Sequence, residues 1–271
     1  MSEFCSRYGP WALIAGGAQG IGEAYSRYAA GQGLNVIVLD FDATALARIE
    51  SELTNEFDVE CLPVEIDLGS ASMLANVISA VAEREVGLLV YNAGLADVGP
   101  FFKTDTGLDF ELQRIAVNVT GPLVLTHHFA APMLARKRGG IILMSSGAGL
   151  KGAPYYAHYS ATKAYDIALA EALWGEFKPY QVDVLAVAAG MTLSTAAKGY
   201  QHLDTSGFQT PQELVKEAME AIGKQPLLVA GQQHRAGHEK MKKVPDEQLI
   251  GYLAKHAIDN FMDGKPPKQA I

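Results

Sequence analysis

The sequence has no block rich in lysine and arginine, and its 30 acidic residues outnumber its 22 basic ones. It therefore lacks the positive patch with which proteins bind nucleic acid or an anionic membrane surface. It also has no run of about 18 uncharged apolar residues, and no basic N-terminus followed by a long apolar stretch. We therefore expect a soluble, cytoplasmic protein whose partner is a small molecule.

Cysteine is scarce as well. Cys5 and Cys61 are far apart and form no CxxC motif, and the seven histidines show no spacing typical of metal ligands. The sequence thus predicts no metal site.

Seven short apolar runs are continuous rather than alternating, as in strands that are buried on both faces of a sheet. They span 11–17, 35–40, 59–66, 86–94, 139–146, 182–190 and 226–232. Stretches of helical length lie between them at 20–33, 42–57, 70–84, 104–136, 157–178 and 210–224. This alternation predicts an α/β fold in which residues 1–271 form a single domain. Its core would be a doubly wound, seven-stranded parallel sheet of the Rossmann type, with helices on both faces.

Two segments do not fit this alternation. Residues 191–209 follow a strand and have mixed polarity, so we expect a lid on the substrate side of the sheet. The apolar residues in the lid could equally fold into the core. Residues 232–271 form a C-terminal extension in which we expect a turn and one helix capped by Asp246, with Leu249, Tyr252, Leu253 and Ile258 along one side.

A glycine-rich segment, AGGAQGIG at 15–22, joins the first strand to the first helix. Glycines at Gly16, Gly20 and Gly22 permit a tight turn and let a pyrophosphate approach the backbone amides of a helix N-terminus. A turn of this kind can also serve packing alone. Its place between strand and helix favours a dinucleotide site.

Asp40 ends the second strand, about 20 residues beyond the glycine-rich segment, where a carboxylate can accept hydrogen bonds from the adenosine ribose. A 2′-phosphate would meet a like charge there, and no basic residue occupies 17–19, 41 or 42. The sequence therefore favours NAD over NADP. Asp40 or Asp42 could instead cap the following helix, and Asp42 suits that role better.

The run SSGAGLKGAPYYAHYSATK at 145–163 contains the candidate acid/base. On a helix that starts near residue 157, side chains four positions apart share a face, and of the three tyrosines only Tyr159 then faces a cation, Lys163. A nearby ammonium favours the phenolate, which a free tyrosine with a pKa of about 10 reaches too rarely near neutral pH. The same spacing also arises by chance in many helices. Ser145 and Ser146 point to opposite faces of their strand, so only one of them can address the substrate.

Together these motifs resemble the short-chain dehydrogenases/reductases across roughly residues 10–195, because the glycine-rich segment, NAG at 92–94, Asn118, the serine pair and YSATK follow in that family's order and spacing. The resemblance implies a catalytic set of Asn118, Ser146, Tyr159 and Lys163, in which Asn118 holds a water that links the lysine to solvent. It implies cofactor contacts by Gly16, Gln19, Gly20, Ile21, Gly22, Asp40, Asp67, Leu68, Asn92, Ala93, Gly94, Tyr159, Lys163, Gly190, Thr192 and Ser194. For the carboxamide contact, Thr195 is an alternative to Ser194.

Three positions depart from the family pattern. Ala15 replaces a threonine, Tyr91 replaces the first asparagine of NNAG, and Ala189 replaces a proline. None of these changes removes a catalytic group, but they put the tightness of cofactor binding in doubt.

RYGPWALIAGG and EAMEAIGKQPLLVAGQ further resemble bacterial hydroxysteroid dehydrogenases. The resemblance implies an NAD-dependent oxidoreductase that interconverts a secondary alcohol and a ketone, with a bulky apolar substrate such as a steroid. It also implies a homo-oligomer, a tetramer or dimer, in which helices near 104–136 and 157–178 pair. The alternatives are a catalytically silent NAD-binding sensor or scaffold and a nucleotide-sugar epimerase. An epimerase has a different glycine spacing and a larger C-terminal domain.

Overall fold

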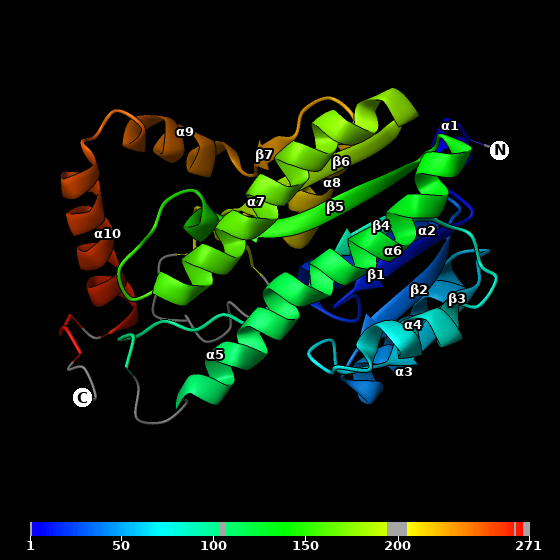
Figure 1. Ribbon diagram of the computed structural model, residues 1–271, viewed down its shortest axis with the longest axis horizontal. Helices are drawn as coiled ribbons and strands as arrows, with labels where there is room; N and C mark the ends of the chain where they lie inside the picture. The colour runs from blue at the N-terminus through cyan, green and yellow to red at the C-terminus, as the bar shows by residue number, and fades with distance from the viewer. Residues whose placement is uncertain (1, 103–106, 194–204, 263, 268–271) are drawn as a thin grey trace.

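A computed structural model of the chain describes residues 2–102, 107–193, 205–262 and 264–267 (Figure 1). The described residues contain a parallel sheet of seven strands in the order β3-β2-β1-β4-β5-β6-β7. The strands are β1 (Trp11–Ala15), β2 (Asn35–Asp40), β3 (Cys61–Glu65), β4 (Val86–Tyr91), β5 (Gly139–Ser146), β6 (Val182–Ala189) and β7 (Leu227–Val229). The predicted doubly wound sheet is thereby confirmed.

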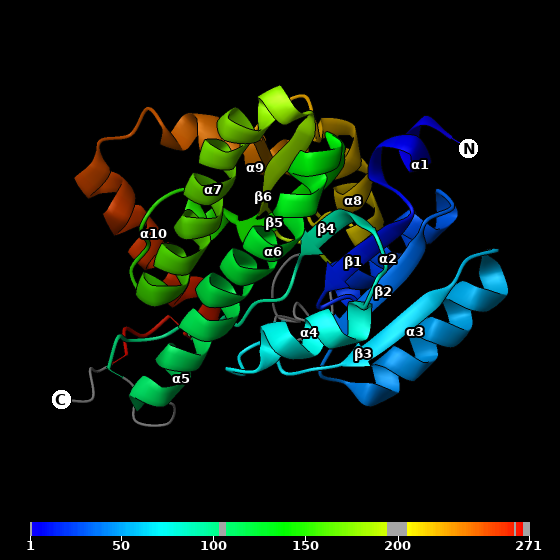
Figure 2. The same ribbon diagram turned by 45° about the vertical axis from the view of Figure 1, so that its right-hand side comes forward.

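Helices cover both faces of the sheet, as the two views show (Figures 1 and 2). One hydrophobic cluster joins the sheet to α2 (Gly20–Gly31), α3 (Ala43–Glu56) and α8 (Pro211–Ala221). A second cluster, on the other face, joins it to α4 (Met73–Val81), α6 (Gly121–Arg136) and α7 (Ala157–Phe177). Alternate strand residues belong to alternate clusters, which explains why the strands are apolar throughout.

The register of the sheet brings the carboxyl ends of the strands to one edge. Ala15 pairs with both Leu39 and Tyr91, and Ser146 pairs with Ala189. The strand order reverses between β1 and β4, since β2 lies on one side of β1 and β4 on the other. Ligands of doubly wound sheets bind outside the carboxyl ends at such a reversal, so the loops that follow β1, β4 and β5 are the place to look for a site.

The stretch predicted as one helix over 104–136 contains an irregular turn. α5 (Gly107–Ile115) runs into a π-helical turn, η1 (Ala116–Thr120), and then into α6. A π turn widens a helix by one residue and changes the direction of the side chains on it. Hydrophobic periodicity carries no signal for such a local change, so the sequence could not have predicted it.

The ends of the chain contain more helix than expected. α1 (Glu3–Tyr8) precedes the sheet, and α9 (Gln232–Met241) occupies part of the stretch expected to be a turn. In α10 (Asp246–Phe261), the prediction that Asp246 caps the helix is wrong. Pro245 is the cap residue, and the Asp246 carboxylate pairs with Lys151 at 2.8 Å. Of the residues expected along one side of α10, Leu249 is buried and Tyr252 is 59% exposed.

The cap of α3 agrees with expectation. Asp42 precedes the helix, and its side chain accepts a hydrogen bond from the Ala45 backbone N–H at 3.0 Å.

Within the described ranges, no helix is long and apolar enough to cross a membrane. Most of the predicted lid, residues 194–204, lies outside the described residues.

Candidate active site

The glycine-rich segment forms the turn from β1 to α2. Gly16 and Gly20 have φ angles of +70° and +58°, a left-handed conformation that favours glycine. A Cβ on Gly22 would lie 1.8 Å from the Gly16 carbonyl oxygen and 2.7 Å from Asn92 Nδ2. The first turn of α2 therefore lies directly against the segment that leads into it.

The N-terminus of α2 is free of a side-chain cap. Gln19 occupies the cap position, but its Nε2 donates to Asp42 Oδ2 at 2.8 Å instead. The backbone N–H groups at the start of α2 can thus receive an anion, which the helix dipole also favours. Ile21 turns the other way and packs against the core. These residues fit the pyrophosphate of a dinucleotide.

Asp40 braces this turn from the end of β2. It is buried, and its carboxylate accepts hydrogen bonds from the N–H groups of Ala18 at 3.1 Å and Phe41 at 2.9 Å. Arg48 on α3 reaches the same turn and donates to the Ala18 carbonyl at 2.8 Å, while Glu23 pairs with its charge at 2.7 Å. The sequence did not predict Arg48 at this turn, because the residue lies on α3 and not next to the glycine-rich segment in the chain.

The segment after β4 lies against the glycine turn. Asn92 Nδ2 donates to the Gly16 carbonyl at 2.8 Å, and the Ala93 N–H donates to the Ala15 carbonyl at 2.9 Å. The predicted cofactor residues of β1 and β4 are thus brought together. Gly94 follows, and a Cβ there would lie 3.5 Å from Lys163 Nζ.

The remaining predicted cofactor residues lie at other strand ends. Beyond β3, Asp67 is exposed and accepts a hydrogen bond from the Gly69 N–H at 2.8 Å, while Leu68 is buried. Beyond β6, the Thr192 hydroxyl donates to the Gly190 carbonyl at 2.9 Å. Ser194 and its alternative Thr195 lie outside the described residues.

The two serines at the end of β5 have different surroundings. Ser145 is buried, and its hydroxyl donates to the Lys163 carbonyl on α7 at 2.7 Å. Ser146 is half-buried, and its Oγ accepts a hydrogen bond from the Ala148 N–H at 3.2 Å. Since that bond uses only an acceptor lone pair, the Ser146 hydroxyl keeps its proton to donate to a ligand. Ser145 has already committed its proton to the helix.

Lys163 is buried one helical turn beyond the half-buried Tyr159. Its Nζ donates to the Met144 carbonyl on β5 at 2.7 Å and to Asp166 Oδ2 at 2.9 Å. Burial by itself would lower the pKa of Lys163, but the charge of Asp166, assisted by the Tyr159 phenol, raises it above the ordinary value. The ammonium is therefore charged at neutral pH, next to the phenol.

Asn118 lies in the π turn and is fully buried. Its Oδ1 accepts from the Leu95 N–H at 2.8 Å, and its Nδ2 donates to the Leu95 carbonyl at 3.0 Å and to Thr162 Oγ1 at 3.1 Å. The side chain thus fastens the segment after Gly94 to α7. The structure brings Asn118 near Lys163, and its role in holding a water stays a prediction.

Tyr91, one of the departures from the family pattern, supports the π turn from β4. Its hydroxyl donates to the Val117 carbonyl at 2.6 Å. Burial raises the pKa of Tyr91, so it stays a neutral donor. A Cβ on Gly121 would lie 2.0 Å from the Tyr91 oxygen, so the phenol needs a glycine at that position.

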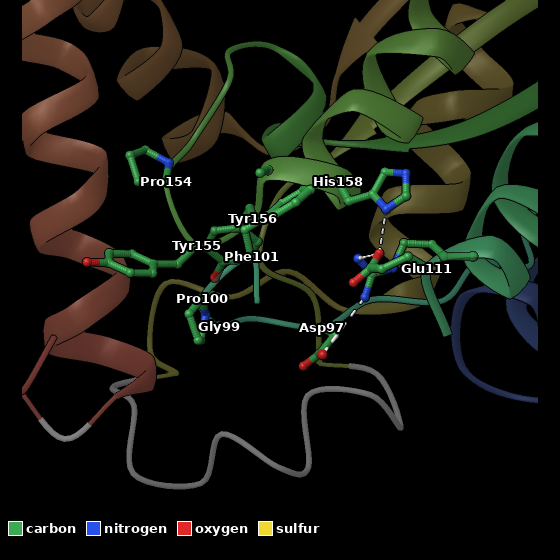
Figure 3. A pocket seen from close by; sticks show the side chains of 11 residues that line it. Asp97, Gly99, Pro100, Phe101, Glu111, Pro154, Tyr155, Tyr156 and His158 are labelled. Atoms are coloured by element: carbon green, nitrogen blue, oxygen red, sulfur yellow. Dashed lines mark hydrogen bonds and ion pairs between the residues drawn. The ribbon is translucent and has the colours of Figure 1, made fainter. Parts of the chain in front are cut away.

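A cavity of about 310 Å³ lies against the first turn of α7 (Figure 3). Glu111 on its wall accepts from His158 Nδ1 at 2.5 Å and from Arg114 at 2.7 Å. The His158 ring points toward Glu111, whereas the Tyr155 ring points away from both (Figure 3). Tyr159 follows His158 in the chain, so this polar cluster lies one residue from the candidate acid/base.

A second cavity, of about 630 Å³, lies between the end of β6, α9 and residues 206–209. His234 on α9 lines it, and Cβ atoms on Gly147 and Gly190 would lie 2.5 Å and 2.9 Å from its side chain. Its Nδ1 lies 3.2 Å from the Ala230 carbonyl, which favours a proton on Nδ1 and leaves Nε2 as an acceptor. Burial lowers the pKa of His234, so the ring is neutral.

The sequence analysis missed His234, because its partners lie about 45 and 90 residues away along the chain, a spacing that no local pattern reports. Two further contacts attach the C-terminal segment to the loop after Ser146. The Tyr156 and Phe261 rings meet edge to face with centroids 6.0 Å apart, and Lys151 pairs with Asp246. The C-terminal extension thus lies beside the loop that joins Ser146 to Tyr159.

Comparison with known proteins agrees with this geometry. Residues 10–206 match the family described as short chain dehydrogenase. The chain is 27% identical over 256 residues to 7beta-hydroxysteroid dehydrogenase of Mediterraneibacter gnavus, covering 91% of this chain and 96% of the relative. A structure from work on 7beta-hydroxysteroid dehydrogenase stereoselectivity superposes with a TM-score of 0.87 at 28% identity, covering 93% and 99% of the two chains. A short-chain dehydrogenase from Sphingobium yanoikuyae in complex with NADPH superposes with a TM-score of 0.72 at 25% identity, covering 87% and 96%.

Proposed function

The chain belongs to the short-chain dehydrogenase family, and we propose that it oxidises a bulky secondary alcohol, such as a steroid hydroxyl, to a ketone and catalyses the reverse reduction, with NAD as its preferred cofactor. The observation that carries this proposal is the buried ammonium of Lys163 on α7, which donates to the Met144 carbonyl of β5 and lies one turn from Tyr159. The similarity to 7beta-hydroxysteroid dehydrogenases over nearly the whole chain supports the substrate class.

The proton chemistry follows from the charges around Tyr159. The Lys163 ammonium favours the phenolate, and the phenolate oxygen takes the hydroxyl proton of the alcohol. The Ser146 hydroxyl donates a hydrogen bond to the substrate oxygen, on which negative charge develops. A bound dinucleotide would supply the hydride acceptor for the carbinol carbon and, in the reverse direction, the hydride donor to the ketone.

The cofactor is held by the residues at the reversal of the sheet. The amides at the start of α2 would receive the pyrophosphate, and Asp40 the adenosine ribose. The remaining N–H of Lys163 is available to the nicotinamide ribose, since Met144 and Asp166 use the other two. Every one of these groups lies at the carboxyl edge of the sheet.

The substrate class is tested by a panel of steroids, bile acids and small aliphatic alcohols, each measured with NAD and with NADP. We expect kcat/KM for at least one steroid or bile-acid hydroxyl to exceed that for small alcohols by about 100-fold, because each carbon that a larger apolar substrate buries adds binding energy. Turnover of small alcohols alone would contradict the bulky substrate. Cofactor binding without turnover anywhere in the panel would favour a sensor or scaffold instead.

The preference for NAD rests on Asp40. In Asp40→Asn the like charge that opposes a 2′-phosphate is removed, the single amide oxygen can still accept from the N–H of either Ala18 or Phe41, and Arg48 is already close by. We expect the ratio of kcat/KM with NADP to that with NAD to rise by at least about tenfold, which is about 1.4 kcal/mol.

Asp183→Asn is the matched control for this change, because Asp183 is also a buried carboxylate but lies at the start of β6, away from the glycine turn, where it pairs with Arg7. It should cost stability without changing the cofactor ratio. A wild-type protein with a higher kcat/KM for NADP than for NAD would refute the preference for NAD. Both cofactors must be measured, because the Sphingobium relative is described in complex with NADPH.

We also propose a homo-oligomer that pairs through α5, α6 and α7. Leu108, Leu112 and Leu123 are exposed on the α5–α6 helix, by 72%, 54% and 43%. Exposed leucines in a row on one element favour association with a second copy. Sedimentation should show a mass of two or four chains of 29.0 kDa, and a mass of one chain at micromolar concentration would contradict the proposal.

A further inference from the structure

Asp166 is a buried carboxylate that the proposed reaction does not use. It lies on α7, three residues beyond Lys163, and only 2% of its surface is exposed. Its Oδ2 accepts from Lys163 Nζ at 2.9 Å, and its Oδ1 is buried with no hydrogen-bond partner among the described residues. A buried carboxylate oxygen without a hydrogen bond destabilises the folded protein. The presence of Asp166 at this position therefore suggests a function that offsets this loss of stability.

The contact fixes the direction of the ammonium. Two of its three N–H groups are directed at Met144 and Asp166, which come from β5 and α7. The position of Nζ is therefore set by two rigid elements rather than by the cofactor. The third N–H is left for the ribose or the Tyr159 oxygen.

The charges around this pair are few. Tyr159 and Tyr165 are the titratable neighbours on α7, and Tyr91 faces Asp166 from β4. The other polar neighbours of Lys163, Asn118 from the π turn and Ser145 from β5, are neutral. Lys163 and Asp166 are therefore the charged residues of this group, and the His158–Glu111 pair, one residue from Tyr159 along the chain, is the same in every variant compared.

We propose that Asp166 is a positioning residue that holds the Lys163 ammonium beside Tyr159 and sets the pH at which Tyr159 ionises. With the carboxylate present, the group of Asp166, Lys163 and Tyr159 is neutral when Tyr159 is protonated and negative when it is ionised. Without the carboxylate the same step leads from a positive group to a neutral one, which is easier in a buried place. Asp166 therefore moderates the acidity that Lys163 confers.

This inference rests on the proposed function, because Tyr159 acts as the acid/base only there. Its test does not, because the ionisation of Tyr159 can be measured without any substrate. We expect the tyrosinate titration midpoint of Tyr159 to move at least about one pH unit downward in Asp166→Asn. The midpoint is measured without substrate, as the difference in tyrosinate absorbance between each protein and its Tyr159→Phe counterpart. In turnover, the acid limb of kcat/KM for alcohol oxidation should move in the same direction.

Asp183→Asn is the matched control. Asp183 is also a buried carboxylate, paired with Arg7 at 2.5 Å and with the Tyr8 hydroxyl at 2.7 Å, but it lies on β6 away from Tyr159. It should lower the melting temperature and leave the Tyr159 midpoint unchanged. If Asp166→Asn does not fold, Asp166→Ala, which also removes the charge, should give the same downward shift.

The outcomes separate clearly. A midpoint in the Asp166 variants that stays within about 0.2 pH unit of wild type would show that Asp166 only packs, whatever the change in stability, and an upward shift would contradict the proposal that Asp166 moderates the acidity of Tyr159. A downward shift in a protein that oxidises no alcohol would keep this inference and overturn the proposed function. Turnover of a steroid alcohol with an unshifted midpoint would do the opposite.

Discussion

Replacing Tyr159 with phenylalanine is expected to lower kcat by about two to four orders of magnitude, the usual contribution of a positioned acid/base. The change removes one oxygen from a half-buried ring, so the fold and the cofactor site should be unaffected. Cofactor affinity, measured by NADH fluorescence titration, should therefore stay within about twofold of wild type, because less than 0.5 kcal/mol of binding energy is at stake.

Tyr165→Phe is the control for this substitution. Tyr165 lies on the same helix, beyond Lys163, and is also half-buried, but it belongs to no part of the proposed site. Its variant should turn over at the wild-type rate. A Tyr159→Phe protein that retains more than about a tenth of wild-type kcat on a verified substrate would remove Tyr159 from the mechanism.

Replacing Gly22 with alanine is expected to weaken cofactor binding at least tenfold and to destabilise the fold by about 1–3 kcal/mol, the usual cost of overpacking. The new Cβ would lie 1.8 Å from the Gly16 carbonyl oxygen, which is backbone and cannot rotate away. The turn must therefore open, and the amides at the start of α2 move with it. NADH titration and urea denaturation measure the two effects.

Gly31→Ala tests whether any new methyl on α2 has this effect. Gly31 ends the same helix, and a Cβ there would meet the Phe57 ring at an ordinary distance of 3.5 Å. We expect unchanged NADH affinity and equal or greater stability, because alanine favours the helix. A Gly22→Ala protein that binds NADH as tightly as Gly31→Ala would show that the glycine turn does not hold the cofactor.

The fold could be predicted from the sequence because its signals are local. The seven apolar runs became the seven strands. The runs 35–40 and 139–146 coincide with β2 and β5, and the other five are shortened by one to four residues, as at Asn92–Gly94 after β4. Asp42 was recognisable as a helix cap from its position alone. The family match over residues 10–206 confirms the resemblance drawn from the glycine-rich segment, Asn118 and YSATK.

What the sequence could not supply depends on contacts between distant segments. The expectation of a turn before α10 missed α9, whose residues carry no apolar stripe to mark a helix. Arg48 reaches the glycine turn only because α3 packs beside α2. The sequence does show Asp166 as an acidic residue three positions beyond Lys163, close enough on a helix to pair with it. Only the structure shows that Asp166 is buried. The assignment of individual cofactor contacts stays a prediction.

In the described part of the chain, α9 and α10 lie against the loop after Ser146 and not against the glycine turn. His234, Asp246 and Phe261 contact the residues around Gly147, Lys151 and Tyr156, whereas the glycine turn contacts Asn92 through Gly16 and Asp40 through Ala18. Substitutions in α9 and α10 are therefore expected to alter substrate preference more than coenzyme preference.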